Sequence, residues 1–172
     1  MSRFSLSALA AMLLLPAAAW AGPDDFGPGP AIPDFGPIAA IDNEMPIPEG
    51  TEFRISYDTN TRAEDGELNS TLTGAARFIN MHAAAGVPVE DIHLAVVIHG
   101  QALHDVTTAT AGPNADLVAA LVEHGVDIYV CGQSAVWYDV DNDELLPGVT
   151  MALSAMTAHA LLQQRGYTLN PF

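Results

Sequence analysis

The sequence predicts a three-layer α/β/α domain, built on a mostly parallel sheet of about five strands. From residue 51 onward, short segments rich in β-branched residues alternate with longer segments of helical periodicity. The segment 92–99 is nearly continuous in apolar residues, as expected of a strand that is covered on both faces. Such alternation is typical of a parallel sheet with helices on both sides.

The elements of this domain follow in a regular order. Strands are expected at residues 53–57, 92–99, 126–131, 149–153 and 167–169. The loop after the first strand is polar from Asp58 to Glu67. Each helix between the strands has a capping or helix-starting residue before it and a glycine after it. These residues are Asn69 or Ser70 with Gly86, Pro113-Asn114 with Gly125, and Ser154 with Gly166.

Residues 22–50 differ in composition from the rest of the chain. They hold seven of the 12 prolines and a rough repeat, Asp25–Pro28 followed by Asp34–Pro37. So much proline and glycine excludes a helix or a central strand. Because the segment is more apolar than disordered segments usually are, we expect an extended arm that packs on the domain or on a neighbouring subunit. A disordered spacer is the alternative.

The first 21 residues have the three parts of a secretory signal: a basic Arg3, an apolar run to Ala19 and a small-residue ending at Ala21. Cleavage after Ala21 would leave a mature chain that starts at Gly22. The apolar run is shorter than a membrane-spanning helix, and no later segment is long enough to be one. We therefore expect a periplasmic or secreted protein that does not insert into a membrane after cleavage.

The charge of the chain excludes one class of binding partner. The chain has 5 basic residues, all arginine, against 21 acidic ones, for a net charge of −16. Such a field repels phosphate backbones, so nucleic acid is not an expected partner.

Cys131 is the only cysteine, which excludes an internal disulfide. A lone cysteine in an exported chain indicates a disulfide between subunits, a buried core thiol or a reactive thiol.

Cys131 ends the third predicted strand and precedes Gly132, Gln133 and Ser134, which can start a helix. In open parallel sheets, ligands bind beyond the carboxyl ends of strands, where the N–H groups of the next helix are unpaired. A thiol in that position can have a lowered pKa and react as the thiolate. Unpaired cysteines are also among the most buried residues, so a small apolar core side chain is the alternative.

A second strand end carries His99. Right-handed crossovers make the two strands parallel, so His99 and Cys131 are expected at the same edge of the sheet. An imidazole close to a thiol favours the thiolate and moves protons, whereas a hydrogen-bonded structural histidine is the alternative. Cys131 and His99 are therefore the candidate catalytic residues. The residues expected to line the pocket are Gly100, Gln101, Gly132, Gln133 and Ser134.

No metal or cofactor is expected. The six histidines and the single cysteine lack the paired spacing of structural zinc sites. Residues 139–143 look like the start of a calcium loop, but Glu144 stands where that loop needs glycine and Thr150 where it needs a bidentate glutamate. A solvated acidic loop is expected instead. Trp137 and Tyr138 before it are either core residues or line a pocket beside the cysteine, and their size favours the core.

Four segments together have a recognisable order and spacing: Arg77–His82, Val96–Ala102, Tyr129–Ser134 and the closing helix that leads into Gly166-Tyr167. From Phe53 to Phe172 the chain thereby resembles the DsrE/DsrF-like family, in particular its exported members. The arm with its Phe-Gly-Pro repeats is similar to the extension of those exported relatives. Each segment is short, and their combination carries the specificity.

The resemblance implies a parallel-sheet α/β fold that assembles into homo-oligomers, often trimers or hexamers, or into hetero-oligomers. For members with the cysteine it implies sulfur relay, in which the thiolate accepts a sulfane sulfur as a persulfide and passes it to a partner protein. Cys131 matches that position, and His99 is carried over as its neighbour. The better-understood relays of the family are cytoplasmic, and export exposes a persulfide to oxidation.

The sequence-based hypothesis is an exported sulfur-relay protein in which Cys131 carries the sulfur. One alternative is a non-catalytic oligomeric binding module that holds a small ligand or metal in the strand-end pocket. Another is a disulfide between subunits through Cys131. The accessibility and acidity of the thiol distinguish the first two.

Overall fold

The computed structural model describes residues 22–171, so the predicted signal sequence lies outside the described residues. Five strands form one sheet: β1 (Phe53–Thr59), β2 (Ile92–Ile98), β3 (Asp127–Cys131), β4 (Val149–Ala152) and β5 (Thr168–Asn170). Every pairing is parallel, and the order across the sheet is β4-β3-β2-β1-β5. The predicted α/β class, with about five mostly parallel strands, is confirmed.

The strands are connected by helices whose ends follow the capping rules. The α-helices of residues 22–171 are α1 (Ser70–Ala84), α2 (Asn114–Glu123), α3 (Gly132–Tyr138) and α4 (Ala155–Gln164). The side chain of Asn69 caps α1 by accepting from the N–H groups of Thr71 and Leu72. Ser154 caps α4 by accepting from the N–H of Thr157. A 3-10 helix, Gly100–Val106, follows β2 directly.

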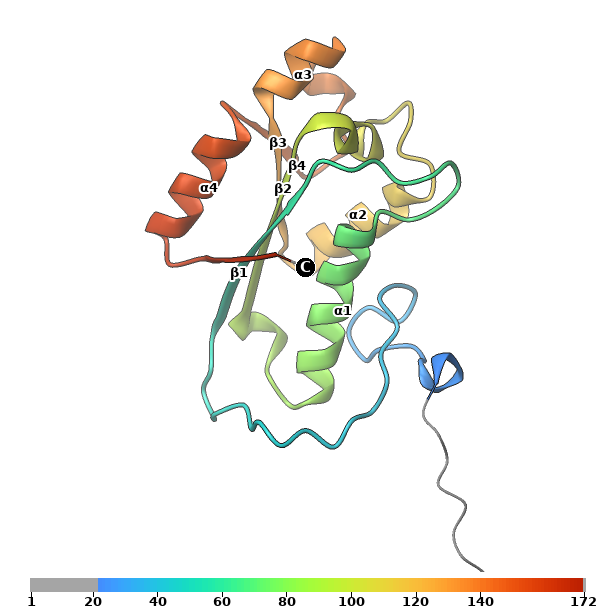
Figure 1. The fold of residues 1–172 in the computed structure, drawn as a ribbon, viewed down its shortest axis with the longest axis vertical. Coiled ribbons are helices and arrows are strands. Elements are labelled where there is room, and N and C mark those ends of the chain that lie inside the picture. The colour runs from blue at the N-terminus through green and yellow to red at the C-terminus, as the bar shows by residue number, and fades with distance from the viewer. Residues whose placement is uncertain (1–21, 172) are drawn as a thin grey trace, which may run out of the picture.

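Helices cover both faces of the sheet, but unequally (Figure 1). On one face α1 and α2 pack on a large core, and on the other α4 packs on a small one. The small core consists of Ala95, Val97, Ala158 and Leu162. The short α3 projects at the carboxyl end of the sheet.

The first strand is longer than predicted. Asp58 and Thr59, expected in the polar loop, continue β1 and pair with Val97 and Ile98 of β2. The long apolar β2 offers pairing partners beyond Tyr57, and a polar side chain is tolerated at a strand end where it finds its own partners. This extension matters for the site, because it places the Asp58 carboxyl on the sheet rather than in a loop.

The arm of residues 22–50 packs along α1 and folds back on itself through an antiparallel bridge between Gly27 and Ile38 (Figure 1). The side chain of Asn80, on α1, is fully buried and forms hydrogen bonds with the backbone of the arm. Asn80 Oδ1 accepts from the N–H groups of Ala31 and Ile32, and Nδ2 donates to the carbonyl groups of Ile32, Phe35 and Gly36. The arm therefore straps onto its own domain.

Glycines in the arm permit this close approach. Gly36 has a φ of +62°, and a Cβ there would collide with the backbone of Arg77. A Cβ on Gly29 would collide with the Asn80 side chain. Beside them, Ile32 is only 2% exposed and joins the large core. The glycines that disfavour regular structure in the arm thus allow its backbone to pack closely against α1.

Candidate functional site

The ends of β1, β2 and β3 bring three reactive side chains to one edge and one face of the sheet. Asp58 pairs with Val97, which contacts α4, and His99 lies two residues beyond Val97. Cys131 lies two residues beyond Tyr129, which also packs toward α4. Since side chains alternate along a strand, all three belong to the face that α4 covers. Ile98 of β2 pairs with Val130 of β3. His99 is the next residue after Ile98, and Cys131 is the next residue after Val130.

Cys131 is the last residue of β3 and the residue before α3, and it is 6% exposed. Burial raises the pKa of its thiol, but hydrogen bonds outweigh that effect, and the pKa is lowered overall. The donors are the backbone N–H groups of Ala155, Ser134 and Gln133, together with the Ser134 hydroxyl. The thiolate is therefore favoured where the starts of α3 and α4 meet.

Ser134 links the cysteine to the end of β2. Its Oγ accepts a hydrogen bond of 3.0 Å from the N–H of Gly100, which leaves the hydroxyl proton for the sulfur. Gly100 has a φ of +54°, and a Cβ there would lie 3.2 Å from the carbonyl oxygen of Asn60. Glycine is needed at this position because both the conformation and the space disfavour a side chain.

Gly132 and Gln133 hold the start of α3 against the turn between β4 and α4. A Cβ on Gly132 would lie 2.7 Å from the carbonyl oxygen of Ala152. Gln133 donates from Nε2 to the carbonyl oxygen of Leu153 at 3.3 Å. Gln101, also predicted to line the pocket, is exposed on the 3-10 helix. Of the other four predicted lining residues, Gln133 and Ser134 donate to the thiol, Gly100 binds the Ser134 hydroxyl and Gly132 packs against the Ala152 carbonyl.

His99 bonds to a carboxylate rather than to the thiol. Its Nε2 lies 3.2 Å from Oδ2 of Asp58, and Nε2 of His159, on α4, lies 2.7 Å from Oδ1 of the same carboxylate. Burial raises the pKa of Asp58, but the two histidines outweigh it, and the pKa is lowered overall. The acidity of Cys131 therefore comes from amides and a hydroxyl, and His99 forms a separate cluster with Asp58 and His159.

Sequence reasoning missed Asp58 and His159. His159 is 101 residues from Asp58 along the chain, and neither belongs to a spaced motif. The available signal was a carboxyl side chain directly after an apolar strand, at the same edge as His99 and Cys131. Nδ1 of His159 is buried without a partner, as is Oγ of Ser56 two residues before Asp58 on β1. Burial of unpaired polar atoms is costly, which marks this part of the α4 interface as polar and imperfectly filled.

The position of Trp137 differs from the predicted one. Its size favoured a core position, but its side chain is 81% exposed on α3. The helix has only seven residues and projects past the sheet, so the side of the helix that carries Trp137 has no core to cover. Tyr138, next to it, does pack against the large core. Trp137 therefore stands on the surface beyond the cysteine.

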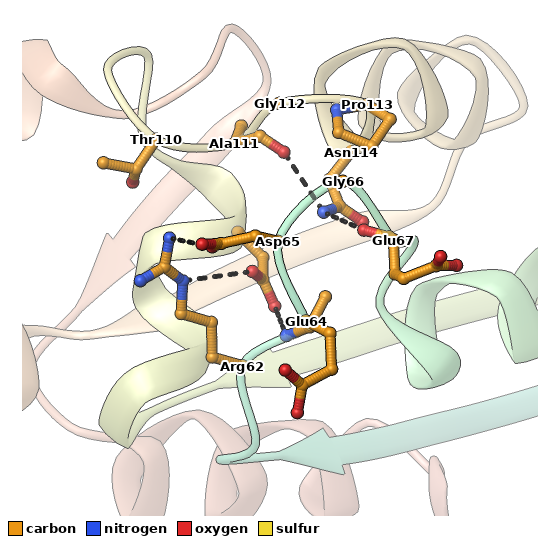
Figure 2. Close-up of a pocket in the computed structure, with 12 residues that line it drawn as sticks. Arg62, Glu64, Asp65, Gly66, Glu67, Thr110, Ala111, Gly112, Pro113 and Asn114 are labelled. Carbon is orange, nitrogen blue, oxygen red and sulfur yellow. Dashed lines mark hydrogen bonds and ion pairs between the residues drawn. The ribbon is translucent and has the colours of Figure 1, made fainter.

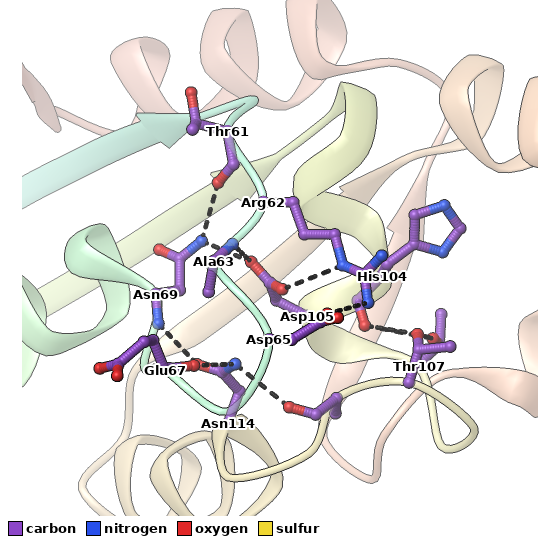
Figure 3. A network of polar contacts seen from close by, with 12 residues as sticks. Thr61, Arg62, Ala63, Asp65, Glu67, Asn69, His104, Asp105, Thr107 and Asn114 are labelled. Carbon is purple, nitrogen blue, oxygen red and sulfur yellow. Dashed lines mark hydrogen bonds and ion pairs between the residues drawn. The ribbon is translucent and has the colours of Figure 1, made fainter.

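A polar pocket lies elsewhere on the carboxyl side, between the loop after β1 and the start of α2 (Figure 2). The buried Asp105 carboxylate accepts from the N–H of Ala63 at 2.9 Å and from Nδ2 of Asn69 at 2.7 Å (Figure 3). Asn114 accepts from the N–H of Asn69 at 2.7 Å. The volume is about 30 Å³, room for a water molecule. These residues bind one another and fix the loop, and we assign them a structural role.

A larger apolar groove of about 310 Å³ lies between α4 and the β3–β4 side of the sheet. It is lined by side chains that include Tyr129, Thr150, Leu161 and Arg165.

Across residues 22–171, no three His, Cys, Asp or Glu side chains are arranged to hold a metal ion. None of the helices in this described part is long and apolar enough to cross a membrane.

Comparisons with known proteins agree with the fold. Residues 57–171 match the sequence profile of the DsrE/DsrF-like family. A solved structure, the protein of unknown function MTH1491 from Methanobacterium thermoautotrophicum, is similar with a TM-score of 0.57 and 17% sequence identity. The similarity covers 70% of this chain and 100% of that chain. No curated protein matches the sequence.

Proposed function

The chain belongs to the DsrE/DsrF-like family, and from this premise we propose that it is an exported sulfur-relay protein in which Cys131 accepts and transfers sulfane sulfur. The family is associated with sulfur relay, and the resemblance implies that Cys131 is the position of the relay cysteine. The observation that carries the proposal is the position of Cys131 between β3 and α3, where three backbone N–H groups and the Ser134 hydroxyl bind its sulfur and lower the pKa of the thiol. A thiolate is the form that attacks sulfur.

The reaction moves one sulfur atom between thiols. The Cys131 thiolate attacks the outer sulfur of a donor persulfide, the bond between the two donor sulfurs breaks, and the donor leaves as a thiolate. Cys131 then carries the persulfide, and the proton of the donor persulfide stays on the transferred sulfur. The N–H groups of Ser134 and Ala155 already bind the sulfur before the step, so they stabilise the thiolate from preorganised positions.

His99 takes a second role in this proposal. It lies just past the end of β2, the strand next to that of Cys131, and its Nε2 lies 3.2 Å from Oδ2 of Asp58. Asp58 thereby leaves Nδ1 of His99 as the nitrogen that exchanges a proton with an incoming or leaving thiol. His99 acts on the departing donor, whereas the amides set the acidity of Cys131.

The test is intact-mass spectrometry of residues 22–172 after incubation with polysulfide or thiosulfate, beside Cys131→Ser. The expected result is a gain of about 32 Da, one sulfur atom on a thiolate, which a reductant removes and the variant never shows. Cys131→Ser removes the nucleophile while it keeps a small polar side chain. No adduct on the wild type, together with slow alkylation of its thiol, would contradict sulfur carriage.

A binding module is the second candidate, and the apolar groove beneath α4 favours it. In that case Cys131 is a buried side chain and the groove holds a small apolar ligand. Slow alkylation of the native thiol at neutral pH, with fast alkylation after unfolding, supports this alternative.

Export and self-association complete the proposal. Residues 1–21 have the pattern of a cleavable signal, and the resemblance to family members that form trimers or hexamers supports a homo-oligomer. N-terminal sequencing of the protein recovered from outside the cytoplasm tests cleavage after Ala21. Light scattering coupled to size-exclusion chromatography gives the number of subunits. A disulfide through Cys131 would appear as a dimer on a non-reducing gel.

A further inference from the structure

Four large apolar side chains are exposed on the elements that surround Cys131. Val136 and Trp137 are each 81% exposed on α3, the helix that begins directly after the cysteine. Leu153 and Met156 are 73% and 80% exposed at the turn into α4. These four side chains are called the Trp137 surface below. Exposed apolar side chains that cluster, rather than occur singly, mark interaction sites.

The elements that carry the two halves of this surface are in contact. Val136 and Trp137 lie four residues after Gly132 and Gln133, and residues at that spacing share one side of a helix. Gln133 donates to the carbonyl oxygen of Leu153, and a Cβ on Gly132 would lie 3.3 Å from that same oxygen. The second turn of α3 therefore stands above the turn that carries Leu153.

The thiol lies between these two halves. Cys131 accepts from the N–H of Ala155, which directly precedes Met156, and from the N–H groups of Gln133 and Ser134 in the first turn of α3. The apolar residues thus lie on the two elements whose first N–H groups bind the sulfur. A partner that covers the Trp137 surface is positioned over the Cys131 edge of the sheet.

The border of the surface is acidic. Asp139, Asp141, Asp143 and Glu144 directly follow α3, and all four are exposed. The chain has no lysine and a net charge of −16. Two copies facing each other through this border would oppose like charges, whereas a partner with Lys and Arg around an apolar centre would be attracted. Charge complementarity therefore favours a basic partner over a second copy of this chain.

We propose that the Trp137 surface docks a thiol protein whose reactive cysteine lies on an apolar surface flanked by Lys and Arg. The inference rests on the proposed function and names the kind of partner that the site serves. In the transfer, the partner thiolate attacks the outer sulfur of the Cys131 persulfide, and the bond between the two sulfurs of that persulfide breaks. Cys131 leaves as a thiolate on its N–H donors, and the partner carries the persulfide with its proton.

The probes are two synthetic peptides of equal length, each with one cysteine among apolar residues, flanked either by Lys and Arg or by Asp and Glu. Trp137 is the only tryptophan between residues 22 and 172, so its fluorescence reports docking without any chemistry at Cys131. Transfer from the loaded protein to the peptide thiol is followed by mass spectrometry. Free cysteine serves as a small acceptor that needs no docking surface.

The double variant Leu153→Ala with Met156→Ala removes part of the surface and keeps the reporter. Its matched control is Ile41→Ala with Met45→Ala, two arm residues that are 77% and 85% exposed. We expect the basic peptide to bind the wild type at least about tenfold more tightly than the acidic one at low salt, with a smaller ratio at high salt. The surface variant should lose about tenfold in affinity for the basic peptide, and the control should match the wild type.

Three results would overturn the docking surface. These are equal affinity for both peptides, equal effects of the surface and control variants, and a wild-type oligomer that dissociates when Leu153 and Met156 are replaced. The last would assign the surface to a second copy. Transfer to free cysteine with no peptide preference overturns the surface and leaves sulfur relay standing. Salt-dependent docking of the basic peptide on a protein that never accepts sulfur overturns the relay alone.

Discussion

Nε2 of His159 lies 2.7 Å from Oδ1 of Asp58, so a side chain of α4 is bonded to the end of β1 across 101 residues of sequence. The core between α4 and the sheet is small, and this polar contact supplements it. Because the N–H of Ala155, at the start of α4, also binds the Cys131 sulfur, the contact holds the helix that covers the thiol. Anchoring of α4 and acidity of the cysteine are therefore linked.

Asp58→Asn should destabilise the protein, because the two histidines bond different carboxylate oxygens and the amide replaces one of these acceptors with an N–H donor. The folded-state pKa of Asp58 is lowered, so its carboxylate contributes stability above the unfolded pKa of about 3.9. That contribution is lost as the pH falls through the folded value. Urea unfolding from about pH 3 to about pH 7 should show the difference from wild type shrink toward the acid end. Glu49→Gln, at an exposed arm position, is the control, and a pH-independent difference would contradict the assignment.

Ser134→Ala should raise the pKa of the Cys131 thiol, because the hydroxyl donates to the sulfur. Alkylation by iodoacetamide at neutral pH should slow, and its pH profile should move to higher pH. His99→Gln is the comparison: its ring bonds to Asp58, so the alkylation profile should stay in place while sulfur transfer slows. A shift of the alkylation profile in His99→Gln would instead show that the imidazole sets the acidity of the thiol.

Two glycine-to-alanine changes should act in opposite directions. A Cβ on Gly132 would lie 2.7 Å from a backbone oxygen, so Gly132→Ala should cost about 1–3 kcal/mol and slow alkylation of Cys131. Gly74 lies inside α1 with nothing within 4 Å of a Cβ, so Gly74→Ala should stabilise by about 0.5–1 kcal/mol. Urea unfolding measures both. Equal effects of the two would contradict the close contact at Gly132.

Asn80→Ala should release the arm. The change removes a buried amide that binds five backbone groups of residues 31–36, and it leaves these groups without their partner. We expect a loss of about 2–3 kcal/mol of unfolding free energy and faster limited proteolysis within residues 22–50. Arg77→Ala removes an exposed hydrogen bond to the Pro37 carbonyl and a cation–π contact with Phe26, and it should have a smaller effect because it leaves no buried group unpaired. Unchanged proteolysis of Asn80→Ala would show that other contacts hold the arm.

The fold and part of the site were predictable from local pattern. Alternation of strand and helix signals predicts a parallel sheet, and a parallel sheet necessarily brings the ends of neighbouring strands together. The register bears this out for His99 and Cys131, which follow one paired position on neighbouring strands. The sequence pattern also predicted where α1 and α4 begin, since Asn69 and Ser154 cap their N-terminal ends through short-range hydrogen bonds.

The properties that depend on neighbouring residues could be read from the amino-acid sequence alone: element type, helix caps, the position of Cys131 after a strand and the acidic charge. The contacts between distant segments became visible only in the folded chain. It joined His159 to Asp58, turned His99 away from the thiol, exposed Trp137 on a projecting helix and placed Asn80 against the arm. The physical reason is that such contacts depend on how helices pack across the sheet, and no local periodicity records that packing.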